Sequence, residues 1–370
     1  MHAIFTCEKP GDCDSYRQIL INCGVECGAG DSVPFHEFHT RVNRGGADVM
    51  IVLMGNEPKE TLRVIQEAHE KKSAPILVVG PSHDAQLILQ SLKAGAREYL
   101  DIDQLRDGLH KALEKLGAPA SAGYRRGRSI VVTGANPGVG VTTVASGLAF
   151  ALGKDNPKNV LLAEFCPGVP ELALDLDLHP SISVTQLLKD WHRVDSTTVR
   201  KAAMEHAGGI DVLTDITNFG MVPAIESGAG KQLMSLVRTM YEYAVYDLGH
   251  GSQTALGQEA VRNADKVVIV LRLDVPSLRM AHDYLIHLAN MGVPSEHVLV
   301  VANKYGQSQQ VNWKKVEEAI GVKVDVWLPD DPGTVNYALN MGLSLPQASS
   351  WSKLIRRFGE LAHQLNGKAK

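Results

Sequence analysis

The sequence has no long hydrophobic run and only a small excess of negative charge. No apolar stretch among its 370 residues approaches the ~20 residues that a membrane-spanning helix requires. The first residues, MHAIFTCEKPGD, become acidic and polar too early for a signal peptide. We therefore expect a cytoplasmic protein. The formal net charge of −4 gives no reason to expect nucleic acid as a partner.

Cysteine is scarce, and its spacing does not match a zinc site. Four of the five cysteines precede residue 28, and none form a C-x-x-C pair: Cys7, Cys13, Cys23 and Cys27. A cytoplasmic setting also disfavours disulfides. A metal or redox site stays open as an alternative, but we expect these side chains to be small buried hydrophobic groups near the first strand and helix.

One segment divides the chain into two parts. The run LGAPASAGYRRGR at 116–128 is rich in small residues and then basic, and an apolar strand pattern follows it. Such a composition is typical of a linker. We expect a first domain at 1–116, a linker at 117–128 and a second domain at 129–370. The hydrophobic fraction of 44% and charged fraction of 21% suit two soluble globular domains.

Short apolar runs alternate with helical patterns on both sides of this linker. Before it, strands are expected at 3–7, 48–53, 76–79 and 98–100, with helices at 59–71 and 84–94. After it, strands are expected at 129–133, 159–163, 210–213, 243–247, 266–271, 297–302 and 324–327. This alternation predicts an α/β protein with two doubly wound parallel-sheet domains, the first of flavodoxin-like size.

The first domain resembles the receiver domain of response regulators. The run KAGAREYL at 93–100 resembles that family's approach to its fifth strand, while ADVMIVL at 47–53 and APILVVG at 74–80 resemble its third and fourth strands. The resemblance implies a phosphoacceptor aspartate at the end of the third strand. That position holds Leu53, the hydroxyl position holds Gly80 and the lysine position holds Ile102.

This domain therefore lacks the groups that a receiver uses. Leucine cannot be phosphorylated, and Mg²⁺ loses its main carboxylate. Glu8 and Asp12 remain near the first strand, where we expect them to face solvent. We predict a docking or dimerisation module without phosphorylation.

The strongest motif of the second domain is VVTGANPGVGVTT at 131–143. It follows an expected strand and opens a helix, as a phosphate-binding loop does. An ordinary strand-to-helix turn with glycines is the alternative. The motif resembles the deviant Walker A loop of the MinD/ParA family, K-G-G-V-G-K-T-T. The resemblance implies nucleotide binding by the retained positions Gly138, Val139, Gly140, Thr142 and Thr143.

Both lysines of that loop are missing. The signature lysine is Asn136, the Walker lysine is Val141, and the leading glycine is Ala135. A charge-assisted contact to phosphate contributes roughly 1.5–3 kcal/mol. Without it, transition-state stabilisation is also lost. We expect ATP or ADP with Mg²⁺ to bind weakly or not at all, and we expect no efficient hydrolysis.

The resemblance extends to later motifs. NVLLAEFCPG at 159–168 places Glu164 and Cys166 where the family has aspartates. Mg²⁺ would then be held by Thr142, Asp247 and Glu164, with Asp247 in the Walker B position; a strand-end aspartate that caps a turn is the alternative. Asn303 matches an adenine-contacting asparagine, and Asp330 and Pro332 lie in a segment that borders the base in the family.

The order of the two domains resembles the CpaE/TadZ proteins of the Tad/Flp pilus system. The runs LALDLDLHP at 172–180 and NADKVVIVLRLDVPSLR at 263–279 are similar to stretches of that group. The resemblance implies a homodimeric factor, in the cytoplasm at a cell pole or at the inner face of the membrane. Its partners would be pilus or secretion assembly proteins.

The end of the chain carries an amphipathic helical pattern. Apolar residues recur from Trp351 to Leu365, and basic residues occupy the other face. Two interpretations stay open, a peripheral membrane contact like that of MinD and a last helix packed on the sheet.

Two further functions also stay open for the chain as a whole. It could be an active MinD/ParA-type ATPase that switches between monomer and dimer. It could instead be a signalling adaptor that works without phosphorylation.

Overall fold

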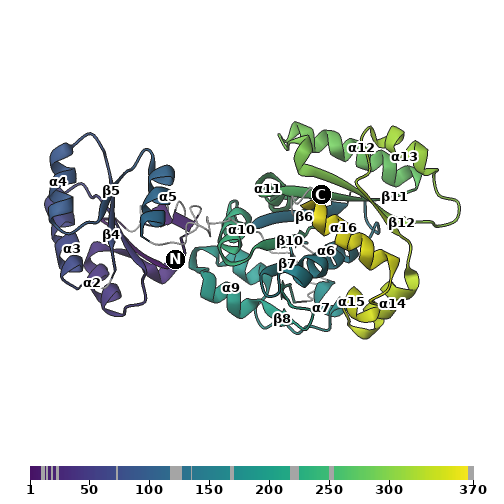
Figure 1. The fold of residues 1–370 in the computed structure, drawn as a ribbon, viewed down its shortest axis with the longest axis horizontal. Coiled ribbons are helices and arrows are strands. Elements are labelled where there is room, and N and C mark those ends of the chain that lie inside the picture. The colour runs from purple at the N-terminus through teal and green to yellow at the C-terminus, as the bar shows by residue number, and fades with distance from the viewer. Residues whose placement is uncertain are drawn as a thin grey trace. The chain divides into compact units, whose positions relative to one another are not determined.

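The computed structural model describes all residues except 10–12, 14–15, 18–19, 22–24, 72–73, 117–126, 135, 167–170, 217–224, 250–253 and 366–370. The chain separates into two compact units, Met1–Arg126 with His192–Thr197, and Gly127–Trp191 with Thr198–Lys370. Each unit has a sheet of its own (Figure 1). Most of the expected linker lies outside the described residues.

The first unit is built on a five-stranded parallel sheet in the order β2-β1-β3-β4-β5. Its strands are β1 (Ala3–Cys7), β2 (Ser32–Pro34), β3 (Val49–Leu53), β4 (Ile76–Gly80) and β5 (Glu98–Asp101). Its helices are α2 (Phe35–Asn43), α3 (Pro58–Glu70), α4 (Ala85–Lys93) and α5 (Leu105–Lys115). This is the strand order of flavodoxin-like folds. The predicted parallel fold is confirmed, and β2 is an additional short edge strand.

Both faces of this sheet are covered, which explains its continuous apolar strands. All five residues of β1, β3 and β4 are buried. Leu109 of α5 packs with Phe5 and Leu53 on one face. Phe38 of α2 and Ile65 of α3 pack on the other face. Strands buried on both sides need apolar residues at every position, not at alternate ones.

The second unit has an eight-stranded sheet in the order β13-β12-β11-β6-β10-β7-β9-β8. The strands are β6 (Arg128–Gly134), β7 (Val160–Glu164), β8 (Met204–His206), β9 (Ile210–Leu213), β10 (Tyr243–Asp247), β11 (Lys266–Arg272), β12 (Val298–Tyr305) and β13 (Val326–Pro329). All pairings are parallel except that of β8 with β9. The doubly wound prediction is confirmed, with β8 as an antiparallel edge strand that the sequence pattern did not indicate.

Helices cover both faces of the second sheet. They are α6 (Val141–Asp155), α7 (Leu172–Asp175), α8 (Val184–Lys189), α9 (Ser196–Ala202), α10 (Ala229–Met240), α11 (Ala255–Asn263), α12 (Val275–Asn290), α13 (Trp313–Ile320), α14 (Pro332–Met341), α15 (Leu345–Ala348) and α16 (Lys353–Leu365). Along β12, Val301 packs with α6 and α16, while Val300 packs with α12 and α13. Successive residues of a strand face opposite sides, so α6 and α16 share one face.

The carboxyl ends of the parallel strands bring the expected site residues to one edge. Asp247 is paired in register with Glu164 of β7 and with Val132 of β6. Asn303 of β12 lies opposite Arg272 of β11. This edge, where β6 runs into α6, is the place where doubly wound proteins bind ligands.

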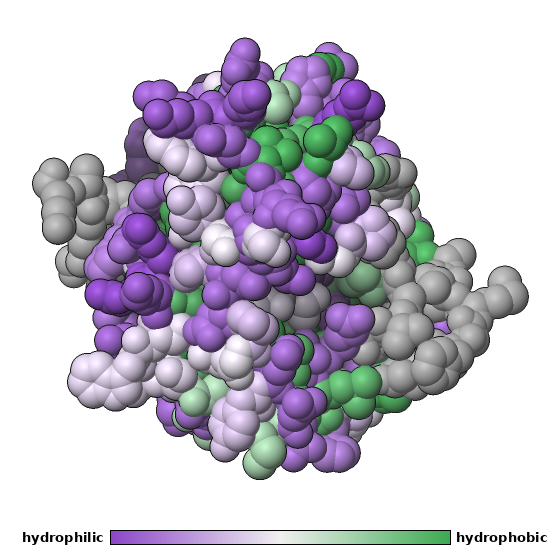
Figure 2. Space-filling view, turned by 90° about the vertical axis from the view of Figure 1, so that its right-hand side faces the viewer, coloured by the Kyte–Doolittle hydropathy of each residue, from purple (hydrophilic) through white to green (hydrophobic). Residues whose placement is uncertain are grey.

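The final helix packs into the core. Leu354, Phe358, Leu361 and Leu365 of α16 are buried together with α6 side chains, whereas Trp351 is 93% exposed just before the helix. The apolar stripe that raised the idea of membrane contact thus faces the protein interior. No described helix is long and apolar enough to span a bilayer. The face drawn in Figure 2 is mostly hydrophilic, with hydrophobic residues in small separate areas.

The cysteines differ in part from expectation. Cys7 and Cys13 are bonded to each other as a disulfide, a pairing that the expected cytoplasmic setting disfavoured. Both are buried and their Cα atoms are 5.7 Å apart, well within the range for a disulfide. Cys27 is a buried free thiol, as expected. Cys23 lies outside the described residues. The described residues hold no group of three or more His, Cys, Asp or Glu suited to a metal ion.

Candidate functional site

The loop between β6 and α6 has the backbone shape of a phosphate-binding loop. Gly138 and Gly140 have φ angles of +77° and +94°, a region that glycine adopts without strain. Gly140 directly precedes α6, so the first amide groups of this helix border the loop. A Cβ atom on Gly138 would meet no heavy atom within 4 Å. The loop therefore keeps open space beside Gly138.

The residue expected at the Walker lysine position belongs to the hydrophobic core. Val141 is 7% exposed and Val139 is fully buried, and both belong to the main core of the second unit. A Cβ on Gly134 would lie 2.6 Å from a Val139 methyl carbon and 2.8 Å from one of Val141. The two valines thus pack under the loop, and neither can supply charge to a phosphate.

Thr142 and Asp247 lie in contact at the start of α6 and the end of β10. The Thr142 side chain forms a hydrogen bond with the carboxyl group of Asp247, and the Gly249 amide donates to its Oδ1 at 2.8 Å. Burial raises the pKa of Asp247 to about 7, against the lowering effect of these hydrogen bonds. Both side chains carry oxygen atoms, the ligand type that Mg²⁺ prefers.

Glu164 is held by groups that the sequence did not point to. Its Oε1 accepts from the amides of Glu171, at 2.8 Å, and Leu172, at 3.3 Å. Its Oε2 accepts from the hydroxyl of Thr214 and, at 3.5 Å, from the amide of Asp215. Burial is the main cause that raises the pKa of Glu164. This carboxylate joins the ends of β7 and β9 to α7.

Cys166 lies beside the same edge as a neutral thiol. Burial, with the nearby carboxylates of Asp247, Glu164 and Glu171, raises the pKa of its thiol to about 12. A Cβ on Gly249 would lie 2.8 Å from its sulfur. A protonated thiol cannot take a proton from water as a carboxylate does.

Asn303 supports the loop. Its Nδ2 donates to the carbonyl of Val139 at 2.8 Å, its Oδ1 accepts from the Lys304 amide at 2.9 Å, and it is 6% exposed. A Cβ on Gly140 would collide with this amide group. The amide expected to contact adenine is thus engaged inside the protein.

The remaining loop positions show little built chemistry. Asn136, at the signature lysine position, donates to the Pro137 carbonyl at 3.4 Å, and its Oδ1 is buried without a hydrogen-bond partner in the described part of the chain. Ala135 lies outside the described residues. Asp330 donates its amide to Tyr305, and Pro332 begins α14.

The corresponding edge of the first unit has been filled in. Leu53 is 6% exposed and packs with α5, and Ile102 packs against the same core. A Cβ on Gly80 would collide with the Tyr99 hydroxyl, which donates to the Pro81 carbonyl at 3.2 Å. Tyr99 therefore occupies the space beside the expected hydroxyl position.

Glu8 lies at the same edge and is partly exposed to solvent. Its Oε2 also accepts a hydrogen bond from the Asn56 amide at 2.6 Å, a contact that the sequence did not indicate. Asp12 lies outside the described residues.

Similarity to known proteins shows which family the chain belongs to. Residues 128–316, just over half of the chain, match the family model described as cellulose biosynthesis protein BcsQ. The chain belongs to the BcsQ family. This BcsQ-family chain is 23% identical over 256 residues to the septum site-determining protein MinD of Thermotoga maritima, which covers 65% of the chain and 89% of that relative.

Solved structures agree on the fold of this BcsQ-family chain. A ParA family ATPase from Chlorobium tepidum TLS matches with a TM-score of 0.60 and 20% identity, covering 64% of this chain and 98% of its own. MinD of Pyrococcus horikoshii OT3, solved with Mg-ADP, matches with a TM-score of 0.56 and 18% identity, covering 65% and 96%. The chain therefore has a MinD/ParA-like P-loop fold.

Proposed function

We propose that this protein is a localisation or scaffold factor with a degenerate nucleotide site, which binds ATP weakly and hydrolyses it poorly. The observation that carries the proposal is Val141, a buried core residue at the position of the Walker lysine. Phosphoryl transfer in P-loop proteins depends on charge placed around the phosphates. Here the loop supplies backbone amides, and the Thr142–Asp247 pair lies beside it. The loop sequence contains no lysine.

Further support comes from the positions that would activate water. Cys166 is a neutral thiol, and Glu164 is held by the backbone amides and hydroxyl around it. Neither is arranged to orient a nucleophile. Thr142 and Asp247 would hold Mg²⁺ if a nucleotide were bound, and the ion would then screen the phosphate charge.

The machinery that such a factor serves is part of the proposal. The two-domain order resembles CpaE/TadZ, which favours pilus or related secretion assembly, while the family description names cellulose biosynthesis. In either case we propose that the protein acts as a homodimer through protein contacts, in the cytoplasm at a pole or at the membrane's inner face. The first unit, a receiver-like module without its phosphorylation groups, would serve docking or dimerisation.

The test measures phosphate release and oligomeric state together. We expect no ATP hydrolysis above background, and the same mass by light scattering with or without ATP and Mg²⁺. Asp283→Ala, an exposed carboxylate on α12, serves as the matched control for Asp247→Ala. The preserved Thr142–Asp247 pair favours one alternative, an active ATPase switch. Hydrolysis that Asp247→Ala abolishes, together with ATP-dependent dimerisation, would establish that alternative instead.

A further inference from the structure

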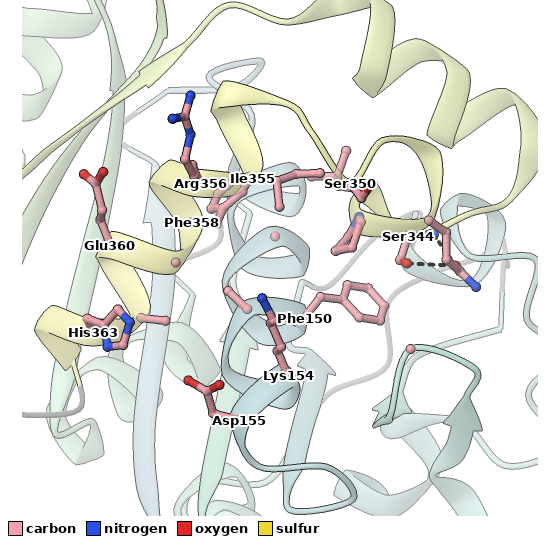
Figure 3. A pocket seen from close by; sticks show the side chains of 18 residues that line it. Phe150, Lys154, Asp155, Ser344, Ser350, Ile355, Arg356, Phe358, Glu360 and His363 are labelled. Carbon is pink, nitrogen blue, oxygen red and sulfur yellow. Dashed lines mark hydrogen bonds between the residues drawn. The ribbon is translucent and has the colours of Figure 1, made fainter.

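A cavity of about 670 Å³ lies between α6, α15 and α16 of the second unit (Figure 3). Its apolar lining includes Phe150 of α6, Leu345 of α15 and Phe358 of α16. Lys154, at the far end of α6, also lines it. Lys154 lies 13 residues beyond Val141, about 20 Å along the helix at 1.5 Å per residue. The cavity is therefore separate from the P-loop.

Gly359, inside α16, leaves space open in this cavity, and no packing contact requires a glycine there. Gly359 lines the cavity, and a Cβ there would meet no heavy atom within 4 Å. By contrast, a Cβ on Gly147, in α6, would collide with the Phe358 ring, so packing requires that glycine. Glycine is a poor helix former. Glycine at 359 thus lowers the helix propensity of α16, and its only effect on packing is to leave space open beside the helix.

The cavity also carries two basic side chains without a partner among the described residues. Lys154 and Arg356 line it, and neither makes a side-chain hydrogen bond or ion pair with the described residues. The acidic lining residues are Asp155 and Glu360, and Glu360 already pairs with Arg357, which lies outside the lining, so two cations face one unpaired carboxylate. Figure 3 shows the Lys154 side chain reaching from α6 toward α16. An acid group on a ligand would complete this arrangement.

We propose that this cavity binds a small amphipathic anion, an apolar chain or ring that carries one acid group. The volume lies within the ~300–1,000 Å³ typical of small-molecule sites, which are mostly apolar with a few polar groups. The apolar part lies between Phe150 and Phe358 over Gly359, and the acid group is held by Lys154. This site is independent of the nucleotide proposal.

Laurate below its micelle concentration is a suitable probe, and calorimetry on the full-length chain measures its binding. We expect one site per chain, with binding reduced about tenfold or more in Gly359→Phe, because the ring fills the cavity. Gly359→Ala should stay within about threefold of the unaltered chain and melt at a higher temperature. Lys154→Gln should weaken binding about fivefold. Lys353→Gln, a cation of α16 outside the lining, and Asp247→Ala should leave binding unchanged.

Circular dichroism and thermal melting establish that each variant is folded. If Gly359→Phe does not fold, Lys154→Gln and Arg356→Gln test the proposal instead, and both should bind laurate more weakly. The proposal is overturned if dodecyltrimethylammonium, a cation with the same chain, binds as tightly as laurate. It is equally overturned if folded Gly359→Phe binds laurate normally, or if only phosphatidylglycerol vesicles and not free laurate bind.

Discussion

The carboxyl edges of the two sheets differ in how much space their side chains leave open. In the first unit the space is occupied, because Tyr99 lies over Gly80 and Leu53 is part of the core. In the second unit the space beside Gly138 is open, and the Thr142–Asp247 pair is intact. The first edge is a packed surface, while the second leaves space open beside the loop that precedes α6.

The largest effect is expected from placing a carboxylate at the occupied edge of the first unit. Leu53→Asp places a carboxylate at a 6% exposed core position, so the first unit should lose about 3–5 kcal/mol of unfolding free energy at pH 8. Hydrogen exchange of β3 peptides under increasing urea measures this loss. Leu53→Asn, similar in size but uncharged, is the matched control. Equal losses in both variants at pH 8 would show that this edge still accommodates charge.

Unfolding measured over a pH series tests the buried carboxyl group at the open edge of the second unit. The pKa of Asp247 is raised from 3.8 to about 7, so the folded state binds this proton more tightly than the unfolded state. Stability should therefore fall as pH rises from about 4 to 7, by roughly 2–4 kcal/mol. Asp247→Asn should make this fall smaller in urea titrations, because one of the carboxyl groups with a raised pKa is gone, whereas the exposed control Asp283→Asn should leave it unchanged. Parallel curves for Asp247→Asn and the unaltered chain would contradict the account.

Two alanine substitutions compare occupied and open space directly. Gly80→Ala should cost about 1–3 kcal/mol, because its methyl group collides with Tyr99. Gly138→Ala meets no atom and should cost about 1 kcal/mol, from its positive φ alone. Thermal unfolding measures both. Removal of the colliding hydroxyl in Gly80→Ala/Tyr99→Phe should recover part of the loss, and an additive double variant would argue against a filled edge.

The smallest effect concerns the hydrogen-bonded ion pair of His2 and Asp31 in the first unit. Hydrogen bonding to Asp31 is the main cause that raises the pKa of His2, whose Nε2 and Nδ1 lie 2.8 Å from Asp31 and 2.6 Å from the Gly46 carbonyl. An acceptor at each ring nitrogen suits an imidazole ring that carries a proton on both nitrogens. This stability is present below pH 6.5 and is lost as pH rises through the raised pKa.

His2→Gln should therefore cost about 0.5–1 kcal/mol at pH 5.5, a modest value because the ring is partly exposed to solvent. At pH 9 it should cost less. Urea unfolding at the two pH values measures the difference, with the exposed His36→Gln as the control. An equal loss at both pH values would show that the imidazolium charge does not contribute.

Much of the fold could be predicted because buried parallel strands leave a strong pattern. The strands at 210–213 and 243–247 match prediction at both ends. The strands β2 and β8 were missed because each has three residues, too few for a periodic signal. The disulfide was missed because sequence separation does not reveal which cysteines meet.

The candidate site was predictable in position but not in its contacts. The loop, Thr142 and Asp247 were pointed out by the resemblance to motifs of the MinD/ParA family, and the structure brings Thr142 and Asp247 into contact. The partners of Glu164 were not, because Thr214 lies 50 residues away and carries no motif. The hydrogen bond from Asn303 to Val139, 164 residues earlier in the chain, was not predicted either. Such contacts depend on how the strand ends meet in space, which local sequence does not encode.

Isothermal titration of the full chain with ATP and Mg²⁺ tests the central claim most directly, with Asp247→Ala and Val141→Lys alongside. The account predicts weak binding that Asp247→Ala reduces and Val141→Lys strengthens about tenfold, because the lysine restores one phosphate contact. Tight binding by the unaltered chain, with no gain from Val141→Lys, would contradict a loop that has kept its shape and lost its charge.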